Sequence, residues 1–309
     1  MALYLSEADV RQMLTMDLAL DAVEAAHRAH ALGRAIDVPR QRTRVPTASL
    51  HILQGALLDE GVMGYKAYTA SREGARFLVH LFDAANGKPL AVIEADFLGM
   101  MRTGAAGGIA AKYLSRPESA VVGLIGAGWQ AQSQLEALCK VRAIKQVKLF
   151  SRNPEKCRLA SADFSQRFGV EVVPAASAEA AVRDSDIVVT VTTASAPVLL
   201  GDWLAPGMHL NAAGSNALIR RELDEKAVAR AGLICVDSRA TALREAGDLL
   251  PALEKGRLHE GQLVELGEIV AGIRPGRIDQ QALTLFESQG MAIQDLAVAK
   301  CLLKKTLTP

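Results

Sequence analysis

The spacing of hydrophobic positions changes from a helical to a strand pattern within the first hundred residues. Ser6 is expected to cap a short helix with Asp9 as its capping-box partner, and Asp17 to cap a second helix that ends near Gly33. Asn86-Gly87 is a hairpin signal, because both positions tolerate a positive φ. The segments rich in Val, Leu, Ile and Tyr that predict a mostly antiparallel sheet lie near 36–45, 49–58, 62–69, 76–83 and 89–95.

From about residue 97 a long helix is expected to carry the chain into a second region, where apolar strands alternate with helical stretches. That alternation is typical of a parallel sheet covered on both faces, and six strands are expected for two mononucleotide-binding halves. A last helix, about 290–305, is expected to return to the first domain. The predicted strands lie near 119–126, 147–151, 170–174, 186–192, 208–212 and 233–236.

The expected fold class is therefore α/β: a Rossmann-type doubly wound parallel sheet plus a second, α+β domain built from both chain ends. We expect residues 1–115 with 285–309 to form the α+β domain. Residues 116–284 are expected to form the dinucleotide-binding domain.

Composition narrows the classes of function. The 309 residues carry a formal net charge of +1 without a clustered excess of Lys and Arg, so no nucleic-acid partner is expected. No stretch approaches the roughly 20 uncharged residues of a membrane helix, and the N-terminus lacks the pattern of a signal peptide. The four widely spaced cysteines indicate neither a metal site nor a disulfide framework. We expect a cytoplasmic protein without a membrane partner.

A glycine-rich turn follows the strand near 119–126 and precedes a predicted helix. Its first glycine allows a tight turn, its second lets a pyrophosphate approach the backbone, and its small last residue allows close packing of helix and strand. This context favours a dinucleotide site over plain strand–helix packing. The expected cofactor-binding residues of the turn are Gly126, Ala127, Gly128, Trp129, Gln130 and Ala131.

The end of the next strand indicates which cofactor is preferred. An NAD site usually has Asp or Glu about 20 residues after the turn, whereas this chain has Ser151-Arg152-Asn153. A guanidinium would pair with a 2′-phosphate that an acid would repel. We therefore expect NADP(H) to be preferred, with NAD(H) possible; the alternative is that Arg152 is an ordinary solvated arginine.

Cationic residues are prominent in the first domain. Arg40, Arg42 and Arg44 alternate along one predicted strand, which would place them on one face. Lys66 lies in the middle of an apolar and aromatic strand, where burial is costly without a partner, and Arg102 interrupts a helix of small residues. Together they suggest a pocket for a carboxylate; the alternative is a solvated strand face with the Lys66 ammonium at its edge.

Many short segments in order along nearly the whole chain resemble the ornithine cyclodeaminase/mu-crystallin family. Besides the glycine turn, they are Arg42-Thr43-Arg44-Val45-Pro46, Tyr65-Lys66, Met101-Arg102-Thr103-Gly104-Ala105, Val191-Thr192-Thr193, Asn211-Ala212-Ala213-Gly214-Ser215-Asn216, Arg221-Glu222-Leu223-Asp224, Val236-Asp237-Ser238, Glu245-Ala246-Gly247-Asp248, Leu266-Gly267-Glu268, and Gly290-Met291-Ala292 with Asp295.

The resemblance implies roles for the two domains and for individual residues. The domain from both chain ends would bind substrate and form a homodimer. Arg42, Lys66 and Arg102 would hold a substrate carboxylate, with Lys66 the candidate catalytic proton donor. The other residues that the resemblance places at the cofactor are Thr103, Ser151, Arg152, Asn153, Thr192 and Ser288.

One position departs from the family. Cyclodeaminases carry an aspartate base where this chain has Asn216, and an asparagine cannot accept that proton. The leading hypothesis is NADPH-dependent reduction of a cyclic ketimine carboxylate, Δ1-pyrroline-2-carboxylate or Δ1-piperideine-2-carboxylate, to the L-amino acid, proline or pipecolate. The alternatives are an ornithine cyclodeaminase, an alanine dehydrogenase-like enzyme, and a non-catalytic protein that binds NADPH and a ligand.

Overall fold

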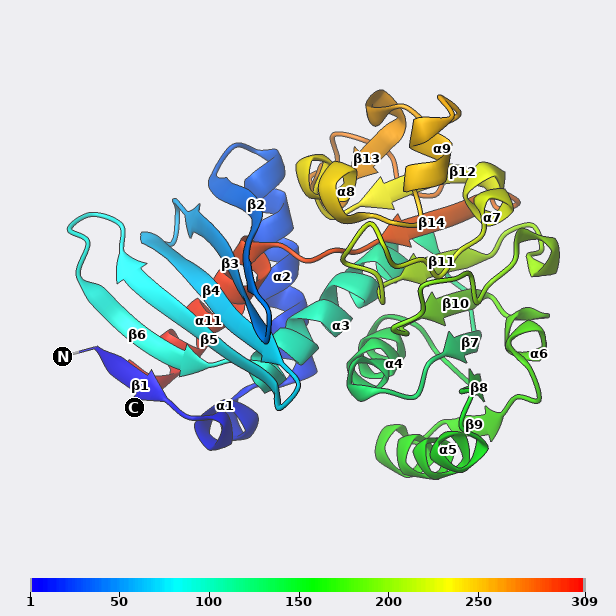
Figure 1. Ribbon diagram of the computed structural model, residues 1–309, viewed down its shortest axis with the longest axis horizontal. Coiled ribbons are helices and arrows are strands. Elements are labelled where there is room, and N and C mark those ends of the chain that lie inside the picture. Colours follow the sequence, from blue (N-terminus) through cyan, green and yellow to red (C-terminus); the bar gives the residue numbers. More distant parts are fainter. Residues whose placement is uncertain (1, 308–309) are drawn as a thin grey trace. The chain divides into compact units, whose positions relative to one another are not determined.

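The computed structural model describes residues 2–307, and the chain divides into two compact units. Unit 1 comprises Met1–Ala105 and Gly290–Pro309, and unit 2 comprises Ala106–Gln289. Each unit contains one β-sheet, and the expected α/β class is confirmed (Figure 1). One division of the chain falls inside the helix α3 (Asp96–Leu114), between Ala105 and Ala106, and the other falls between Gln289 and Gly290, whereas the expected boundaries were at 115/116 and 284/285.

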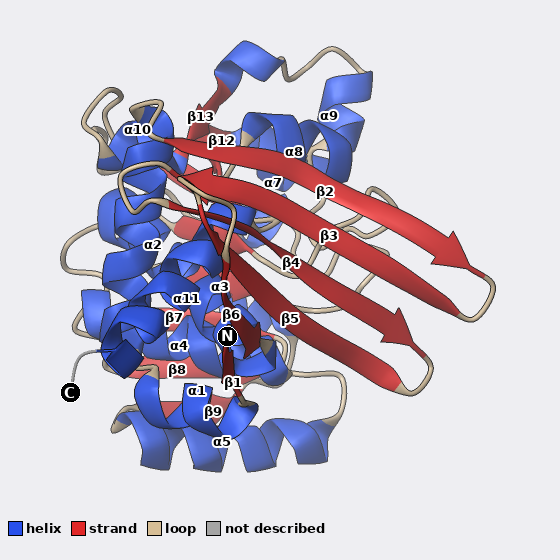
Figure 2. Ribbon diagram, turned by 90° about the vertical axis from the view of Figure 1, so that its left-hand side faces the viewer, coloured by secondary structure: helices blue, strands red, loops and turns tan. Residues whose placement is uncertain are grey.

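The sheet of unit 1 has six strands in the order β1-β6-β5-β4-β3-β2. β1 pairs parallel to β6 and every other pairing is antiparallel, which confirms the expected mostly antiparallel sheet (Figure 2). β1 was not predicted, because three residues are too few for a periodic pattern. The bounds are β1 (Leu3–Leu5), β2 (Ala35–Val45), β3 (Ala48–Leu57), β4 (Val62–Ser71), β5 (Gly74–Asp83) and β6 (Pro89–Glu94).

Local sequence signals explain the first two helices. Ser6 caps α1 (Glu7–Met13) in a complete capping box with Asp9, as expected. The expected cap of α2 (Met16–Ala31) was wrong by two positions: the Thr15 side chain accepts the Leu18 amide, and Asp17 lies in the first turn. An acid there still interacts favourably with the positive end of the helix dipole.

The helix α11 (Ala292–Leu307) packs on one face of this sheet, against β2 to β5, and α2 packs on α11. Glycine at position 64 of β4 lets α11 approach the sheet closely, because a Cβ at this position would lie 3.1 Å from a methyl group of Leu296 in α11. The opposite face is the one on which odd-numbered residues of β4 and their cross-strand partners project. Exposed apolar side chains on that open face include Ile36, Leu50, Met63 and Leu78.

Unit 2 contains the Rossmann-type sheet, in the order β13-β12-β14-β11-β10-β7-β8-β9 with all strands parallel. The expectation of six strands was wrong, because β13 and β14 were not predicted. β14 lies between β11 and β12, so a boundary at 284/285 would cut through this strand. The bounds are β7 (Val121–Ile125), β8 (Gln146–Phe150), β9 (Glu171–Pro174), β10 (Ile187–Thr190), β11 (His209–Ala212), β12 (Ala231–Val236), β13 (Leu263–Glu265) and β14 (Leu283–Glu287).

Two apolar cores cover the two faces of this sheet. Along β10, Ile187 and Val189 belong to one core and Val188 to the other, as expected for a strand buried on both sides. α3, α4 and α5 contribute to the first core, whereas α6, α7 and α8 contribute to the second. The helices of unit 2 are α4 (Trp129–Val141), α5 (Pro154–Phe168), α6 (Ala178–Val182), α7 (Glu225–Arg230), α8 (Arg239–Glu245), α9 (Leu250–Glu254) and α10 (Leu266–Val270), with short 3₁₀ turns at Gly201–Trp203 and Glu260–Gln262.

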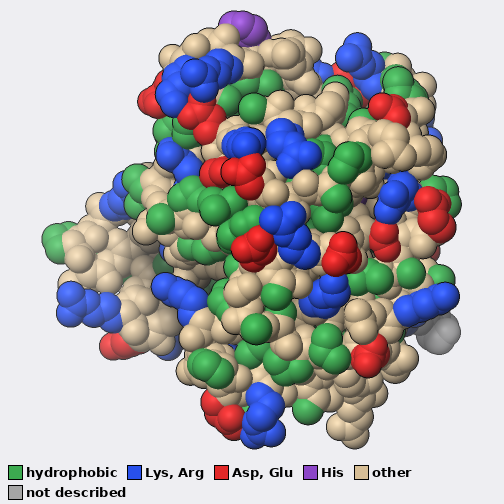
Figure 3. Space-filling view, turned by 90° about the vertical axis from the view of Figure 1, so that its right-hand side faces the viewer, with side chains coloured by type: hydrophobic (Ala, Val, Ile, Leu, Met, Phe, Trp, Pro, Cys, Tyr) green, Lys and Arg blue, Asp and Glu red, His purple; other side chains and the backbone are tan. Residues whose placement is uncertain are grey.

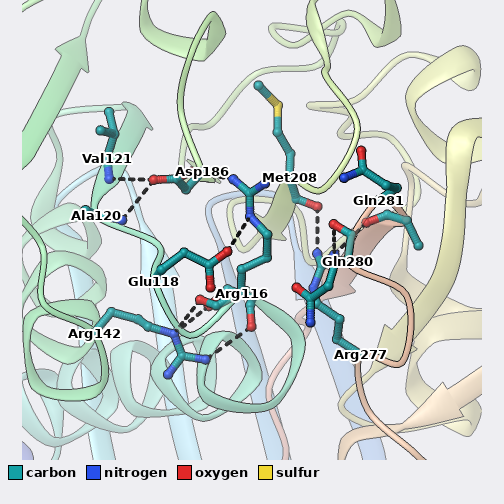
Figure 4. A network of polar contacts seen from close by, with 12 residues as sticks. Arg116, Glu118, Ala120, Val121, Arg142, Asp186, Met208, Arg277, Gln280 and Gln281 are labelled. Carbon is teal, nitrogen blue, oxygen red and sulfur yellow. Dashed lines mark hydrogen bonds and ion pairs between the residues drawn. The ribbon is translucent and has the colours of Figure 1, made fainter.

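An arginine network holds the end of α3 at the amino edge of this sheet (Figure 4). Arg142 donates to four carbonyl oxygens between residues 111 and 116, and Arg277 donates to the Leu114 and Met208 carbonyls. Arg116 pairs with Asp186 at 2.6 Å. These donors satisfy helix-end carbonyls that would otherwise lack partners.

No helix within residues 2–307 is both long and apolar enough to cross a membrane. On the face shown in Figure 3, Lys and Arg side chains are interspersed with Asp and Glu. This distribution agrees with the formal net charge of +1.

Candidate active site

Lys66 lies in the middle of β4 and is only 3% exposed. Its neighbours across the sheet are Leu53 and Val79, which are also buried, so the ammonium does not reach solvent along the strand. Its Nζ instead donates to Asp295 Oδ1 of α11 at 3.0 Å. The structure therefore contradicts the alternative of a lysine with its ammonium at a solvated edge.

Arg102, in the first half of α3, binds the same carboxylate. Its Nε donates to Asp295 Oδ1 at 3.0 Å, and its Nη1 donates to Gln294 Oε1 at 2.9 Å. The Gln294 amide is fixed in turn, because its Nε2 lies 3.0 Å from Nε2 of the buried His27. Burial lowers the pKa of His27 to about 3, so the neutral ring can accept this bond. Gly290 makes room for the guanidinium, since a Cβ there would lie 2.5 Å from Nη1.

The cationic cluster formed by Lys66, Arg102 and Asp295 carries an excess of positive charge. Two buried cations share Asp295 Oδ1, while Asp295 Oδ2 has no hydrogen-bond partner among the described residues. Burial lowers the pKa of Lys66 to about 8. The negative charge of Asp295 acts to raise this pKa, whereas the positive charges of Arg102 and Arg40 act to lower it further. Lys66 is thus still mostly charged at neutral pH. A buried net positive charge is costly, so the cluster favours an additional anion.

Arg42 lies on the same face of the sheet as Lys66. In β2 it is directly opposite His51, which is opposite Tyr68, and Tyr68 is two positions from Lys66 in β4. His51 stacks on Tyr68 with 4.3 Å between ring centroids. Burial, and then the charges of Arg42, Arg40 and Arg44, lower the pKa of His51 to about 4, so the face is cationic but His51 itself is neutral.

No roles were predicted from the sequence for Asp295, Gln294 or His27. A signal for the first two was present: Gln294 and Asp295 are adjacent polar residues within the apolar run 291–299. Buried polar groups need partners, so such a pair in an apolar helix predicts a polar contact in the core. His27 gave no comparable signal, because one histidine on a helix is usually explained by packing.

The glycine turn of unit 2 has the geometry that a dinucleotide needs. Gly126 has φ +118°, and a Cβ there would lie 2.6 Å from the Val191 carbonyl oxygen, so only glycine fits. Gly128 is the N-cap of α4 and forms no side-chain cap, and a Cβ there would meet nothing within 4 Å. Ala131 is fully buried. An open space beside uncapped helix amides suits a pyrophosphate.

A groove of about 640 Å³ begins at this turn and continues between α4 and α5. Ala127, Gly128, Trp129 and Asn153 are among its lining residues, and Asn153 is the N-cap of α5. Trp129 is 40% exposed. Of the other expected cofactor residues of unit 2, Arg152 is exposed, whereas Gln130, Ser151 and Thr192 are half-buried and Ser288 is buried. Thr103 lies in the part of α3 that belongs to unit 1, where its hydroxyl donates to the Gly99 carbonyl at 2.7 Å.

Glu222 connects the two segments that follow β10 and β11. Its Oε1 accepts the Thr192 amide at 2.6 Å, and its Oε2 accepts the Gly214 amide at 2.8 Å. The segments are so close that a Cβ at Gly214 would lie 2.4 Å from the Thr192 carbonyl oxygen. Burial raises the pKa of Glu222 to about 7. From the sequence, Glu222 belonged only to the motif Arg221-Glu222-Leu223-Asp224, and no role was predicted for it.

Asn216 lies in the same segment after β11 and is half-buried. Ser288 follows β14 and donates to Asp237 Oδ2 at 3.3 Å. Carboxyl ends of parallel strands lie at one edge of a sheet, which is where doubly wound proteins bind their ligands. The glycine turn, Thr192, Asn216 and Ser288 all follow such strand ends in unit 2.

The chain is similar to known proteins along nearly its whole length. The model of the ornithine cyclodeaminase/mu-crystallin family matches residues 2–308. A Δ1-pyrroline-2-carboxylate reductase of Bacillus cereus is 38% identical over 231 residues, which are 74% of this chain and 71% of that protein.

Two solved structures are similar over 99% of this chain. One is the Δ1-pyrroline-2-carboxylate reductase of Thermococcus litoralis in complex with NADH and L-proline, with TM-score 0.94, 35% identity and 97% of that chain covered. The other is an archaeal alanine dehydrogenase dimer with bound NAD, with TM-score 0.93, 34% identity and 96% of that chain covered.

Proposed function

We propose a substrate and a cofactor for this chain, which belongs to the ornithine cyclodeaminase/mu-crystallin family and is an NAD(P)-dependent oxidoreductase. The reaction is NADPH-dependent reduction of a cyclic ketimine carboxylate to the L-amino acid: Δ1-pyrroline-2-carboxylate to proline, or Δ1-piperideine-2-carboxylate to pipecolate. The observation that carries this proposal is the buried pair of cations, Lys66 and Arg102, on one carboxylate. Their uncompensated charge matches a monoanionic substrate.

In this proposal the residues of unit 1 bind the substrate and deliver a proton. Arg102 and Arg42 orient the carboxylate, and Lys66 both attracts it and donates a proton to the imine nitrogen. A lysine with a pKa of about 8 is suited to donate near neutral pH. NADPH, when bound at the glycine turn of unit 2, supplies the hydride that C2 gains. Positioning and charge provide much of the barrier reduction for a substrate that is already cyclic.

The NADP(H) preference is supported by the chemistry at the end of β8. Ser151-Arg152-Asn153 stands where an NAD-specific site would place an acid, and the Arg152 side chain is exposed and able to meet a phosphate. NAD(H) is the alternative cofactor, since both similar structures contain it.

Two other reactions need to be separated from this one. An ornithine cyclodeaminase requires a base for the attacking amine, and Asn216 cannot supply it. An alanine dehydrogenase activity is the second candidate, because the archaeal alanine dehydrogenase resembles this chain almost as closely as the pyrroline-2-carboxylate reductase does.

The test is a panel of substrates at fixed enzyme concentration, with NADPH oxidation followed for the two cyclic imines and for pyruvate plus ammonia. NADP⁺ reduction and ammonia release are followed for ornithine. We expect the cyclic imines to be reduced more efficiently than pyruvate plus ammonia, with no comparable conversion of ornithine. Ornithine conversion at rates that rival imine reduction would refute the proposed reaction. Cofactor binding without turnover of any substrate would favour a non-catalytic ligand-binding protein.

We also propose that the chain forms a two-fold symmetric homodimer through unit 1. The sheet presents exposed apolar residues such as Met63 and Leu78 on its open face, and it ends in edge strands that need cover. Symmetric dimers are the commonest homo-oligomers, and the archaeal relative is a dimer. Sedimentation at micromolar concentration should give a dimer for the unmodified chain and a smaller species for Leu78→Asp. A monomeric unmodified chain would contradict this assembly.

A further inference from the structure

Lys156 lines the same groove as the glycine turn. The groove of about 640 Å³ includes Gly128 and Trp129 on one side and Asn153 and Lys156 on the other. Arg152 immediately precedes Asn153 in the chain. The turn and the end of β8 are adjacent in the sheet, because Ile125 pairs with Phe150 and the Gly126 amide donates to the Phe150 carbonyl at 2.9 Å. Lys156 thus belongs to the region where an adenosine ribose is held in this fold.

The backbone of α5 fixes the position of Lys156. The Asn153 side chain accepts the Lys156 amide at 2.9 Å, which places Lys156 at the third position of the helix. Cα–Cβ bonds of a helix tilt toward its N-terminus, so the Lys156 side chain is directed back over the start of α5. Arg152 immediately precedes the N-cap Asn153, so the start of α5 toward which Lys156 is directed is continuous with the segment that carries Arg152.

Arg152 and Lys156 differ from the neighbouring arginines in their ion pairing. Arg158 pairs with Glu155 at 2.7 Å, and Arg167 pairs with Asp163 at 3.2 Å. Within residues 2–307, Arg152 and Lys156 are both exposed and form no such ion pair. Because Glu155 is occupied by Arg158, the start of α5 keeps two cations available for an anion.

We infer that Lys156 is a second specificity-determining cation, which binds the 2′-phosphate of NADPH together with Arg152. This inference rests on the proposed preference for NADP(H). A 2′-phosphate carries up to two negative charges and several acceptor oxygens, so two cations match it better than one. The role of Lys156 is confined to cofactor selection, because its position in unit 2 has no part in the substrate-binding cluster of unit 1.

The test compares Lys156→Gln, Lys156→Arg and the matched control Lys145→Gln. Lys145 is also exposed but precedes β8 at the opposite end of the strand. Binding is measured by calorimetry for NADPH and NADH, and for adenosine 2′,5′-bisphosphate against 5′-AMP, so the result does not depend on turnover. Losing one charged contact to a phosphate should weaken NADPH and the bisphosphate by about tenfold and leave NADH and AMP within about twofold. Lys156→Arg and Lys145→Gln should bind like the unmodified protein.

The outcomes separate this inference from the proposed function. If Lys156→Gln leaves all four affinities unchanged while Arg152→Gln weakens NADPH, the NADP(H) preference stands and the role of Lys156 is refuted. If Lys156→Gln weakens both cofactors equally, Lys156 does not recognise the 2′-phosphate, and the inference also fails. If the unmodified protein binds NADH as tightly as NADPH and AMP as tightly as the bisphosphate, the proposed cofactor preference fails and removes the basis of the inference.

Discussion

Asp295→Asn is the substitution that most directly tests whether Asp295 keeps Lys66 charged. The change keeps the shape of the side chain but removes the carboxylate that Lys66 and Arg102 both contact at 3.0 Å. Removing one partner of a buried ion pair usually costs about 3–5 kcal/mol, because the remaining charge stays buried. Lys66 can avoid part of that cost by losing its proton. We therefore expect the folded variant to contain a neutral Lys66 at neutral pH.

The size of the effect follows from the ion-pair geometry. Two unit charges separated by 3.0 Å interact with about 5 kcal/mol at an effective dielectric constant of about 20. A tenfold change in proton affinity corresponds to about 1.4 kcal/mol, so losing even half of this interaction moves the pKa of Lys66 from about 8 to below 7. At pH 7.5 the variant would then hold the charged lysine in a small minority of molecules. We expect kcat/KM for the cyclic imine to fall by about tenfold or more.

The assay is the pH dependence of kcat/KM with saturating NADPH. In the unmodified protein, activity should decline as the pH rises through about 8, where Lys66 loses its proton. In Asp295→Asn the same decline should occur below pH 7. The matched control is Asp21→Asn, which removes an exposed carboxylate from α2 and should leave the profile unchanged. A decline that stays near pH 8 in Asp295→Asn would show that Asp295 does not maintain the charge of Lys66.

Stability should also depend on pH through Lys66. Its pKa in the folded protein, about 8, lies below the ordinary value of 10.5, so the unfolded chain binds more protons between these two pH values. The contribution of Lys66 to the free energy of unfolding therefore increases as the pH rises through this interval, by about 3 kcal/mol in total. Denaturant unfolding of the unmodified protein and of Lys66→Met, compared across this range, measures the contribution.

Three further substitutions have defined outcomes. Arg152→Asp should reverse the preference between NADPH and NADH, because the acid repels a 2′-phosphate and can bind a ribose hydroxyl; titration with both cofactors measures the change. Glu222→Gln should weaken cofactor binding by about tenfold, since an amide has one acceptor oxygen for the two amides of Thr192 and Gly214. The unmodified protein should likewise lose cofactor affinity as the pH falls below about 7, where protonation of Glu222 turns one acceptor into a donor. Lys66→Ala should lower kcat as well as raise KM, and a change in KM alone would restrict Lys66 to binding.

Features that depend on neighbouring residues were predictable from the sequence. The glycine turn was predictable because Gly126 needs a conformation that only glycine adopts easily, and because a strand precedes it and a helix follows. The parallel and antiparallel regions were predictable because the spacing of apolar residues reflects which side of each element is buried. Lys66 was identified as a candidate because a lysine within an apolar strand is costly to bury without a partner.

The partners of these residues, in contrast, depend on contacts between segments that are far apart in the chain. Lys66 and Asp295 are 229 positions apart, and Arg102 and Asp295 are 193 positions apart, so no local pattern could join them. The same applies to β14, which pairs with β11 and β12 although other elements separate it from both along the chain. Local spacing encodes the conformation of a segment and its buried side. Which distant segments then meet, and whether a buried charge gains a counterion, depends on the packing of the whole unit.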